Sequence, residues 1–387
     1  MKLMQVTDLA GENEFIKVNV EINKGNPHYI RPLDKDIRFV FDEKQNKAFR
    51  FGECIRWILK DDKGKLLGRI AAFTNKKYKN KGDDLAIGGI GFFDSINSQQ
   101  AADMLLDVAK HWLIQKGMEA MDGPINFGER DRWWGLMTEG FYEPVYCMNF
   151  NPPYYVELFE NYGFKNFYNQ VCFALKVKDK VSQKFYDRHA KLAADPNFKA
   201  IHINKKQLRK FADDFTVVYN KAWAGHGGLK QMHKEVVLKM FEQMKPIMDE
   251  RVIWFTYYKE EPIAIWVNLP DLNQWFRHLN GRFDALGKLK FLWVKATKKC
   301  TKFTGLVFGI VPEYQGMGVD SFMIMEGAKI IQGQHIYEDY EMQWIGEFNP
   351  KMINIAESLG TYRSRRLVTY RHIFDRTKEF KAHPILA

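Results

Sequence analysis

The sequence predicts an α/β fold built from two similar halves. The predicted elements follow the same order in both: a hairpin, a buried strand, a long helix, another strand, a helix that begins with Asn-Pro and ends at Gly, and a last strand. The glycine of the buried strand and the terminal glycine are 72 residues apart in the first half (Gly91 to Gly163) and 51 in the second (Gly309 to Gly360). The 21-residue excess is about the length of an aromatic segment at 126–150.

A duplicated domain with one insertion explains this spacing. We expect an N-terminal domain that carries the insertion 126–150, then a linker, then a C-terminal domain. Their predicted bounds are 1–177, 178–199 and 200–387.

In the first half, alternating or continuous apolar runs indicate strands, and apolar residues at helical spacing indicate helices. The helix at 97–117 is the clearest, because it has a polar start at Asn97 and Ser98 and a glycine at its end. Strands are predicted at 2–7, 54–60, 65–74, 85–93, 118–126 and 166–177, and helices at 10–25, 97–117 and 152–163.

The second half repeats the pattern after a charged stretch. Its hairpin at 251–269 turns at 259–261. The other strands are predicted at 200–203, 303–311, 339–346 and 361–374, and helices at 208–223, 234–248, after a loop within 312–333, and at 349–360.

Composition excludes several classes of protein. The hydrophobic fraction of 46% and charged fraction of 27% are those of an ordinary globular chain. No apolar run is long enough to span a membrane, and the first fifteen residues lack the apolar core of a secretory signal. Four cysteines without a CxxC pair indicate neither a disulfide scaffold nor a zinc ribbon. We therefore expect a cytoplasmic protein with reduced thiols.

The net charge of +11 favours anionic partners such as nucleic acid, phosphorylated cofactors or anionic membranes, although it also serves solubility. The motifs of nucleophile-elbow hydrolases, P-loop NTPases and zinc proteases are absent from the sequence, and no His/Cys set has metal-ligand spacing. We expect no metal.

The sharpest motif is V-P-E-Y-Q-G-M-G-V-D at 311–320, between a strand and a helix. Its glycines let backbone N–H groups converge at a helix N-terminus, which forms a cradle for an anion such as pyrophosphate. The acidic Asp320 in the first helical turn favours the helix but repels a diphosphate.

The strand, this loop, the helix, the next strand and the Asn349 helix together resemble the Gcn5-related N-acetyltransferase (GNAT) superfamily, with the signature [QR]-x-x-G-x-[GA]. Gln315 and Gly318 match it, and Asp320 stands where Gly or Ala is usual. The resemblance covers 200–387 well and 1–175 in element order. It is strongest to bacterial proteins with two GNAT-like domains, each a mixed, mostly antiparallel sheet flanked by helices.

The resemblance implies that acetyl-CoA or another acyl-CoA is held by the second half. Pantetheine would lie beside the strand that ends at Gly309, and the pyrophosphate would bind the loop N–H groups. The implied cofactor-binding residues are Gly309, Ile310, Val311, Gln315, Gly316, Met317, Gly318, Val319 and Asn349.

Attack of an amine on a thioester needs a base, N–H donors for the oxyanion and an acid for the thiolate. Glu313 in the loop and His226 between glycines are candidate bases, and Tyr362 is a candidate acid. Each also has an ordinary structural interpretation, as a solvated, loop or packing residue.

The aromatic insertion interleaves charges with large rings, a composition that suits a substrate pocket or an aromatic core over the seam between the halves. The candidate substrate residues are Asn126, Glu129, Arg130, Trp133, Trp134, Tyr154 and Tyr155.

We expect an acyl-CoA-dependent N-acyltransferase that acts on a small amine or an aminoacyl group. One alternative is a Fem-like transferase that uses aminoacyl-tRNA, which the positive charge favours. The other is a GNAT-fold binding protein without catalysis, which the shortage of acid and base candidates favours.

Overall fold

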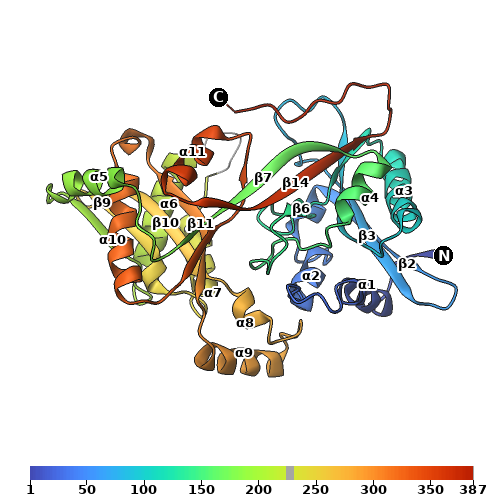
Figure 1. Ribbon diagram of the computed structural model, residues 1–387, viewed down its shortest axis with the longest axis horizontal. Helices are drawn as coiled ribbons and strands as arrows, with labels where there is room; N and C mark the ends of the chain where they lie inside the picture. Colours follow the sequence, from blue (N-terminus) through green and yellow to red (C-terminus); the bar gives the residue numbers. More distant parts are fainter. Residues whose placement is uncertain (224–230, 387) are drawn as a thin grey trace.

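A computed structural model describes residues 1–223 and 231–386. Within them the strands form one continuous sheet of mixed direction, mostly antiparallel, in the order β1-β2-β3-β4-β5-β14-β7-β12-β11-β10-β9-β8, with β6 beside β14 and β13 beside β7 (Figure 1). The strands are β1 (Lys2–Gln5), β2 (Gly52–Lys60), β3 (Leu66–Asn75), β4 (Ile87–Ser95), β5 (Ala120–Gly123), β6 (Leu136–Glu139), β7 (Lys165–Lys176), β8 (Phe198–His202), β9 (Ile253–Tyr258), β10 (Glu261–Pro270), β11 (Lys302–Ile310), β12 (Asp339–Met342), β13 (Ile345–Gly346) and β14 (Tyr362–Ile373).

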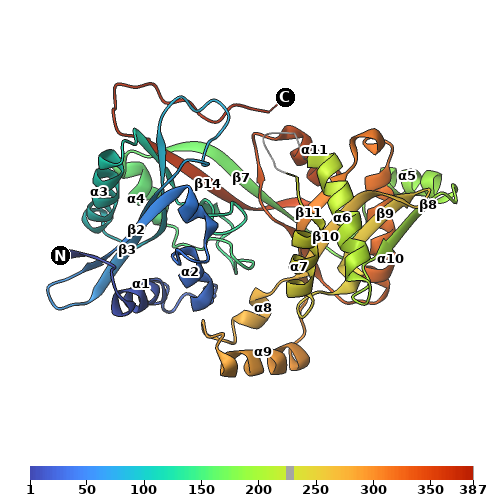
Figure 2. The same cartoon turned by 180° about the vertical axis from the view of Figure 1, so that it is seen from behind.

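Helices flank the sheet in both halves, as the sequence predicted (Figures 1 and 2). They are α1 (Leu9–Ile22), α2 (Asp34–Val40), α3 (Gln99–Gln115), α4 (Tyr155–Tyr162), α5 (Gln183–Ala193), α6 (Leu208–Trp223), α7 (Lys234–Met244), α8 (Asn273–Phe276), α9 (Ala285–Thr297), α10 (Val319–Gly333) and α11 (Pro350–Ser358). In the described residues, no helix has the length and apolar character needed to cross a membrane.

Local side-chain chemistry sets several helix ends. The Ser98 hydroxyl accepts from the N–H of Ala101 at 3.4 Å and starts α3, and Asn349 caps α11 in the same way. Gly163 ends α4 with φ of +106°, a conformation that favours glycine. These are the polar starts and glycine ends that the sequence predicted.

The last strand of each half lies in the sheet of the other half. β7, which ends the first half, pairs with β12 of the second half, and β14, which ends the second half, pairs with β5 of the first. β7 and β14 also pair with each other along most of their length. Figure 1 shows these two long strands crossing the middle of the molecule. The two halves are therefore joined by reciprocal strand exchange as well as by the chain between them.

The charged stretch at 178–199 contains a helix, α5, that packs against α10. His189 on α5 stacks on the ring of Phe322, and its Nε2 lies 2.7 Å from the Glu326 carboxylate. This contact attaches α5 to the second half. The domain bounds at 177 and 200 stay a prediction.

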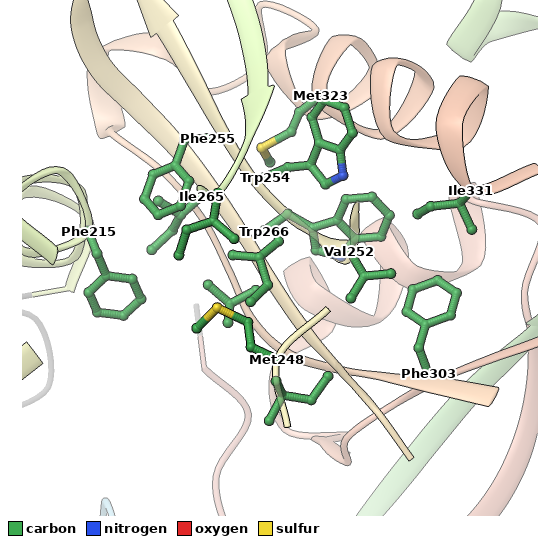
Figure 3. Close-up of a cluster of buried hydrophobic side chains, with 14 of the residues drawn as sticks. Phe215, Met248, Val252, Trp254, Phe255, Ile265, Trp266, Phe303, Met323 and Ile331 are labelled. Atoms are coloured by element: carbon green, nitrogen blue, oxygen red, sulfur yellow. The ribbon is translucent and has the colours of Figure 1, made fainter. Parts of the chain in front are cut away.

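The core of the second half lies between the sheet and its helices (Figure 3). Trp254 and Trp266 on neighbouring strands face α10, which approaches them closely at Gly327. A Cβ on Gly327 would lie 2.9 Å from the Trp266 ring, so the glycine permits this contact. α10 is thereby held firmly over the sheet, with its N-terminus beside the end of β11.

Candidate functional site

The strands β11 and β12 separate in the middle of the second half. They pair in parallel only from Lys302 to Gly305 on β11. Beyond Gly305, β11 continues to Ile310 with β10 as its strand partner, after a register shift opposite Val267 and Asn268. Among the described residues, no strand pairs with the other edge of β11 over Leu306–Ile310. An extended ligand can use that edge as a strand would.

A cavity of about 530 Å³ lies at this separation. Its volume is within the range of sites that enclose a whole small molecule. Apolar side chains from both halves of the opening, from α6, α10 and α11, and from the segment after β7 make up most of its wall. The residues are Leu175, Val177, Asp179, Val181, Tyr219, Trp223, Trp266, Phe303, Gly305, Leu306, Val307, Phe308, Ile324, Ala328, Ile331, Gln332, Tyr340, Met342, Gln343, Trp344, Ile345, Gly346, Phe348, Asn349, Met352, Ile355, Ala356 and Leu359.

Few groups in this wall can ionise. Of the described residues that line it, these are Asp179, Tyr219 and Tyr340. Burial raises the pKa of Tyr340 to about 12, although the Trp266 Nε1–H donates to its oxygen at 3.4 Å. Tyr340 is therefore a neutral hydroxyl that carries its proton at physiological pH. The remaining wall is built to hold apolar material and to exclude water.

The glycine loop joins the end of β11 to α10. A short 3-10 helix, Pro312–Tyr314, is followed by Gly316 with φ of +75° and Gly318 with φ of +91°. The Gln315 amide donates to the carbonyl of Ile310 at 3.0 Å and ties the loop to the strand. In the described part of the chain, no hydrogen bond occupies the backbone N–H groups of residues 316–319. They can therefore bind an anion at the start of α10.

Arg188 of α5 lies against this loop. A Cβ on Gly318 would be 3.2 Å from the Cβ of Arg188, and the Arg188 guanidinium lies 4.0 Å from the Asp320 carboxylate. The charge of Asp320 is thus offset by a cation, and the loop can accept a phosphate despite the acidic residue. No local pattern in the sequence indicates Arg188, because its position depends on the packing of α5.

The first half has no such opening. The N–H of Ile125 donates to the carbonyl of Ile90 at 2.7 Å, so the chain after β5 runs beside β4. A Cβ on Gly91 would be 2.0 Å from the Ile125 carbonyl oxygen. The place that corresponds to the second-half opening is filled by the chain itself.

The structure gathers the predicted cofactor-binding residues around one edge of the opening. Gly309 packs against the ring of Trp223, which also lines the cavity. Asn349 both caps α11 and lines the cavity. The other predicted residues form the end of β11 and the loop, and they are Ile310, Val311, Gln315, Gly316, Met317, Gly318 and Val319.

The predicted catalytic residues are not gathered in the same way. Glu313 is exposed in the 3-10 turn. Tyr362 begins β14, is 53% exposed and does not line the cavity. His226 lies outside the described residues. The structure instead brings Tyr340 to the cavity, a residue that sequence reasoning missed because nothing in its strand marks it.

The predicted substrate residues lie in the first half, away from this cavity. Asn126, Trp133, Trp134 and Tyr155 are buried. The Arg130 guanidinium covers the Trp134 ring, whose Nε1–H donates to the Tyr168 hydroxyl at 2.8 Å. Glu129 is exposed, and the Tyr154 hydroxyl donates to the Ser95 carbonyl.

A small space, of about 60 Å³, lies beside this group, and Trp133 and Tyr155 line it. None of its wall is shared with the large cavity. The volume suits a few water molecules. The geometry favours an aromatic core in the first half, the second interpretation given above.

Comparison with known proteins agrees with this architecture. No protein-family model matches the chain. A bacterial ceramide synthase of Caulobacter vibrioides is 23% identical over 373 residues, which cover 94% of this chain and 96% of that protein. Protein YghO of Escherichia coli is 24% identical over 322 residues, which cover 81% and 80%.

Among solved structures, a tandem GNAT protein from the clavulanic acid biosynthesis pathway superimposes with a TM-score of 0.54 at 10% identity, over 96% of this chain and 98% of that one. A GCN5-related glucosamine N-acetyltransferase region in a fungal multi-domain GH3 β-N-acetylglucosaminidase gives a TM-score of 0.53 at 11% identity. The match covers 96% of this chain but only 38% of the fungal protein. The chain therefore has the tandem GNAT fold, as the resemblance in its sequence implied.

Proposed function

We propose that the chain is an acyl-CoA-dependent N-acyltransferase that transfers a long acyl chain to a long-chain amine. The observation that carries this proposal is the apolar cavity of about 530 Å³ where β11 and β12 separate, next to a glycine loop with free N–H groups. The pantetheine arm would fill the part of the cavity beside Leu306–Phe308, and the apolar remainder suits a long acyl chain better than an acetyl group.

The coenzyme part of the donor fits the polar side of the opening. Pantetheine carries amide groups that can bond to the free edge of β11 at Leu306–Ile310. Its diphosphate would accept from the N–H groups of residues 316–319, with the Arg188 cation beside them. Both contacts use chain groups that have no other strand or backbone partner among the described residues.

The acyl part fits the apolar side. Trp266, Phe303 and Ile324, with their neighbours, offer the kind of surface that releases water from a hydrocarbon chain. Burial contributes about 0.8 kcal/mol for each methylene group, so a long chain gains far more than a short one. The same wall keeps water away from the thioester and so limits hydrolysis.

For the acceptor, we propose a long-chain amino alcohol. The Caulobacter relative is named a ceramide synthase, and a ceramide is the amide of a fatty acid with such an amine. In the reaction the amine nitrogen bonds to the acyl carbon and the carbon–sulfur bond breaks. The ammonium loses one proton to solvent before it attacks, and the nitrogen loses a second as the amide forms. We propose that the neutral Tyr340 hydroxyl protonates the leaving sulfur and regains its proton from the nitrogen.

The cavity favours this function over a transferase that uses aminoacyl-tRNA. Aminoacyl groups and nucleotides carry polar and charged groups that need partners, and few polar side chains line the cavity. The charge of +11 remains compatible with either donor.

The test is a transfer assay with the full chain and acetyl-, octanoyl- or palmitoyl-CoA, each with sphinganine, with glucosamine or without amine. Release of free thiol and mass spectrometry of the amide are measured together. We expect amide formation from palmitoyl-CoA and sphinganine at the highest rate. Transfer of acetyl groups only, or to glucosamine only, would contradict the proposal.

A substitution in the cavity wall tests whether the acyl chain lies in this cavity. Ala328 on α10 lines the cavity, and Ala328→Phe places a ring in it. We expect the rate with palmitoyl-CoA to fall by about tenfold or more while the rate with octanoyl-CoA is retained, since the shorter chain needs less of the cavity. The short donor is the internal control for folding.

A further inference from the structure

The helix α9 presents an apolar face to solvent. At 100° per residue, Leu286, Leu289 and Trp293 lie on the side of the helix opposite its buried residues, and Leu292 lies at the edge of the same face. The exposed fractions are 68% for Leu286, 64% for Leu289, 60% for Trp293 and 58% for Leu292. Trp293 is the one exposed tryptophan in the described residues. Scattered exposed apolar residues are normal, but four on one helix face form a patch.

Lysines border this face on both sides. Lys288 lies along one flank of α9 and Lys290 along the other, by the same helical geometry. Lys298 follows at its end, whereas Lys295 donates to the Pro246 carbonyl and Lys299 pairs with Glu338. Among the described residues, no carboxylate forms an ion pair with Lys288, Lys290 or Lys298. The face therefore combines an apolar centre with a positive rim.

The connection that contains α9 is longer than its two strands require. β10 and β11 are adjacent antiparallel strands, which a short turn can connect. Instead the connection runs from Asp271 to Thr301 and contains both α8 and α9. α9 lies at the edge of the molecule, away from the sheet, in both views (Figures 1 and 2).

The inner side of α9 is well anchored, so its outer face is not simply a poorly packed surface. Phe291 points inward and contacts Trp275, Phe276 and Phe283. The connection also reaches the first half, where the Asn273 side chain donates to the Pro144 carbonyl at 2.8 Å. The apolar outer face is thus held in a fixed orientation.

We propose that α9 docks the protein on the surface of an anionic lipid bilayer, with the helix axis parallel to the membrane. Its leucines and Trp293 enter the interface, and the flanking lysines contact lipid phosphates. This arrangement of an apolar face with lysines on both flanks complements a negatively charged, apolar surface on both counts. A bilayer matches it better than a second copy of the chain, which would bring the same lysines together. The proposal does not depend on the enzymatic function above.

The test is flotation of the full chain with vesicles of equimolar phosphatidylglycerol and phosphatidylcholine, and with vesicles of phosphatidylcholine alone, without any acyl-CoA or amine. We expect binding to the anionic vesicles that weakens as NaCl is raised. Leu289→Glu and Trp293→Glu should each lower the partition coefficient by about tenfold or more, because each removes apolar area and adds a negative charge.

Two of the variants below, Leu9→Glu and Lys63→Glu, control for charge alone. Leu9→Glu changes a leucine of the same exposure on α1, at the first half, and should leave binding unchanged. Lys290→Glu should weaken binding several-fold, and Lys63→Glu in the β2–β3 turn should not.

Absence of binding to anionic vesicles would overturn the proposal, as would equal binding by the α9 variants. A chain that forms dimers, loses them on Leu289→Glu and ignores vesicles would show that a second copy covers this face instead. Because the vesicles contain no substrate, none of these results depends on transferase activity.

Discussion

At the scale of single residues, two tyrosines differ in their position relative to the cavity. The sequence alone does not show which of them is the better candidate for the general acid. Tyr340 lines the cavity and is neutral, whereas Tyr362 is exposed at the start of β14. Strand patterns place a residue on one face of a sheet but do not say which strands will separate. The catalytic assignment therefore needed the tertiary arrangement, although the glycine loop was visible in the sequence.

This difference leads to a paired test. Tyr340→Phe should lower kcat for amide formation by about 100-fold, since general acid catalysis contributes at least that much, with little change in KM. Tyr362→Phe should leave both unchanged. Equal kcat values in the two variants would remove Tyr340 from the mechanism.

Buried Asp271 should make stability depend on pH. Burial raises its pKa to about 6, although Lys302 opposes the shift. The native state then binds this proton more tightly than the unfolded chain does. The free energy of unfolding should therefore fall as pH rises from about 4 to about 6, by on the order of 2 kcal/mol.

Urea denaturation of the wild type and of Asp271→Asn across this pH range measures the contribution. The asparagine variant should lose this part of the pH dependence, while Asp84→Asn, at an exposed position, should retain it. Identical slopes for wild type and Asp271→Asn would show that Asp271 ionises normally.

At the scale of elements, the sequence predicted most helices and strands but not all. The helix at 208–223 was predicted with the bounds that α6 has, because its apolar spacing is regular. α5 was read as linker, since its buried residues are only Phe185 and Leu192. A helix with so little apolar surface is stabilised by its contact with α10, which no local pattern reveals.

The contact of α5 with the loop allows a test of the proposed phosphate site. Arg188→Met should weaken binding of free coenzyme A by about tenfold, because it removes a charge-assisted contact to phosphate and leaves Asp320 unopposed. Lys184→Met on the same helix is the control. Isothermal titration measures both, and unchanged affinity in Arg188→Met would place the phosphates elsewhere.

At the scale of the whole molecule, reciprocal strand exchange makes one sheet of two repeats. The repeated order of elements was visible in the sequence, but the exchange was not, because a last strand satisfies the same apolar pattern beside either half. A buried charge cluster marks the junction. Arg365 on β14 donates to Glu341 on β12 at 2.6 Å, and Lys302 donates to the same carboxylate at 3.0 Å.

Arg365 and Lys302 lower the pKa of the Glu341 carboxyl group. Burial alone would raise the pKa of Glu341, but Arg365 and Lys302 together hold it below its usual value. Arg365 also donates to the carbonyls of Gly140, Tyr142 and Glu143 in the insertion. The insertion and the exchanged strand are thus fixed to the second half at one point.

Removing one charge should therefore destabilise the whole chain. We expect Arg365→Met or Glu341→Leu alone to lower the free energy of unfolding by about 3–5 kcal/mol, since each removes a main partner of a buried charge. The double variant should lose less than the sum of the two. Urea unfolding measures all three, and additive losses would mean that the pair does not act as a unit.

We propose that a long acyl chain lies in the opening between β11 and β12. The most direct measurement compares the dissociation constants of stable thioether analogues of acetyl-CoA and palmitoyl-CoA, for the wild type and for Ala328→Phe. We expect the wild type to bind the palmitoyl analogue more than about 100-fold tighter than the acetyl analogue, and the variant to lose most of this preference. Equal affinity for the two analogues, or a preference that Ala328→Phe leaves intact, would contradict it.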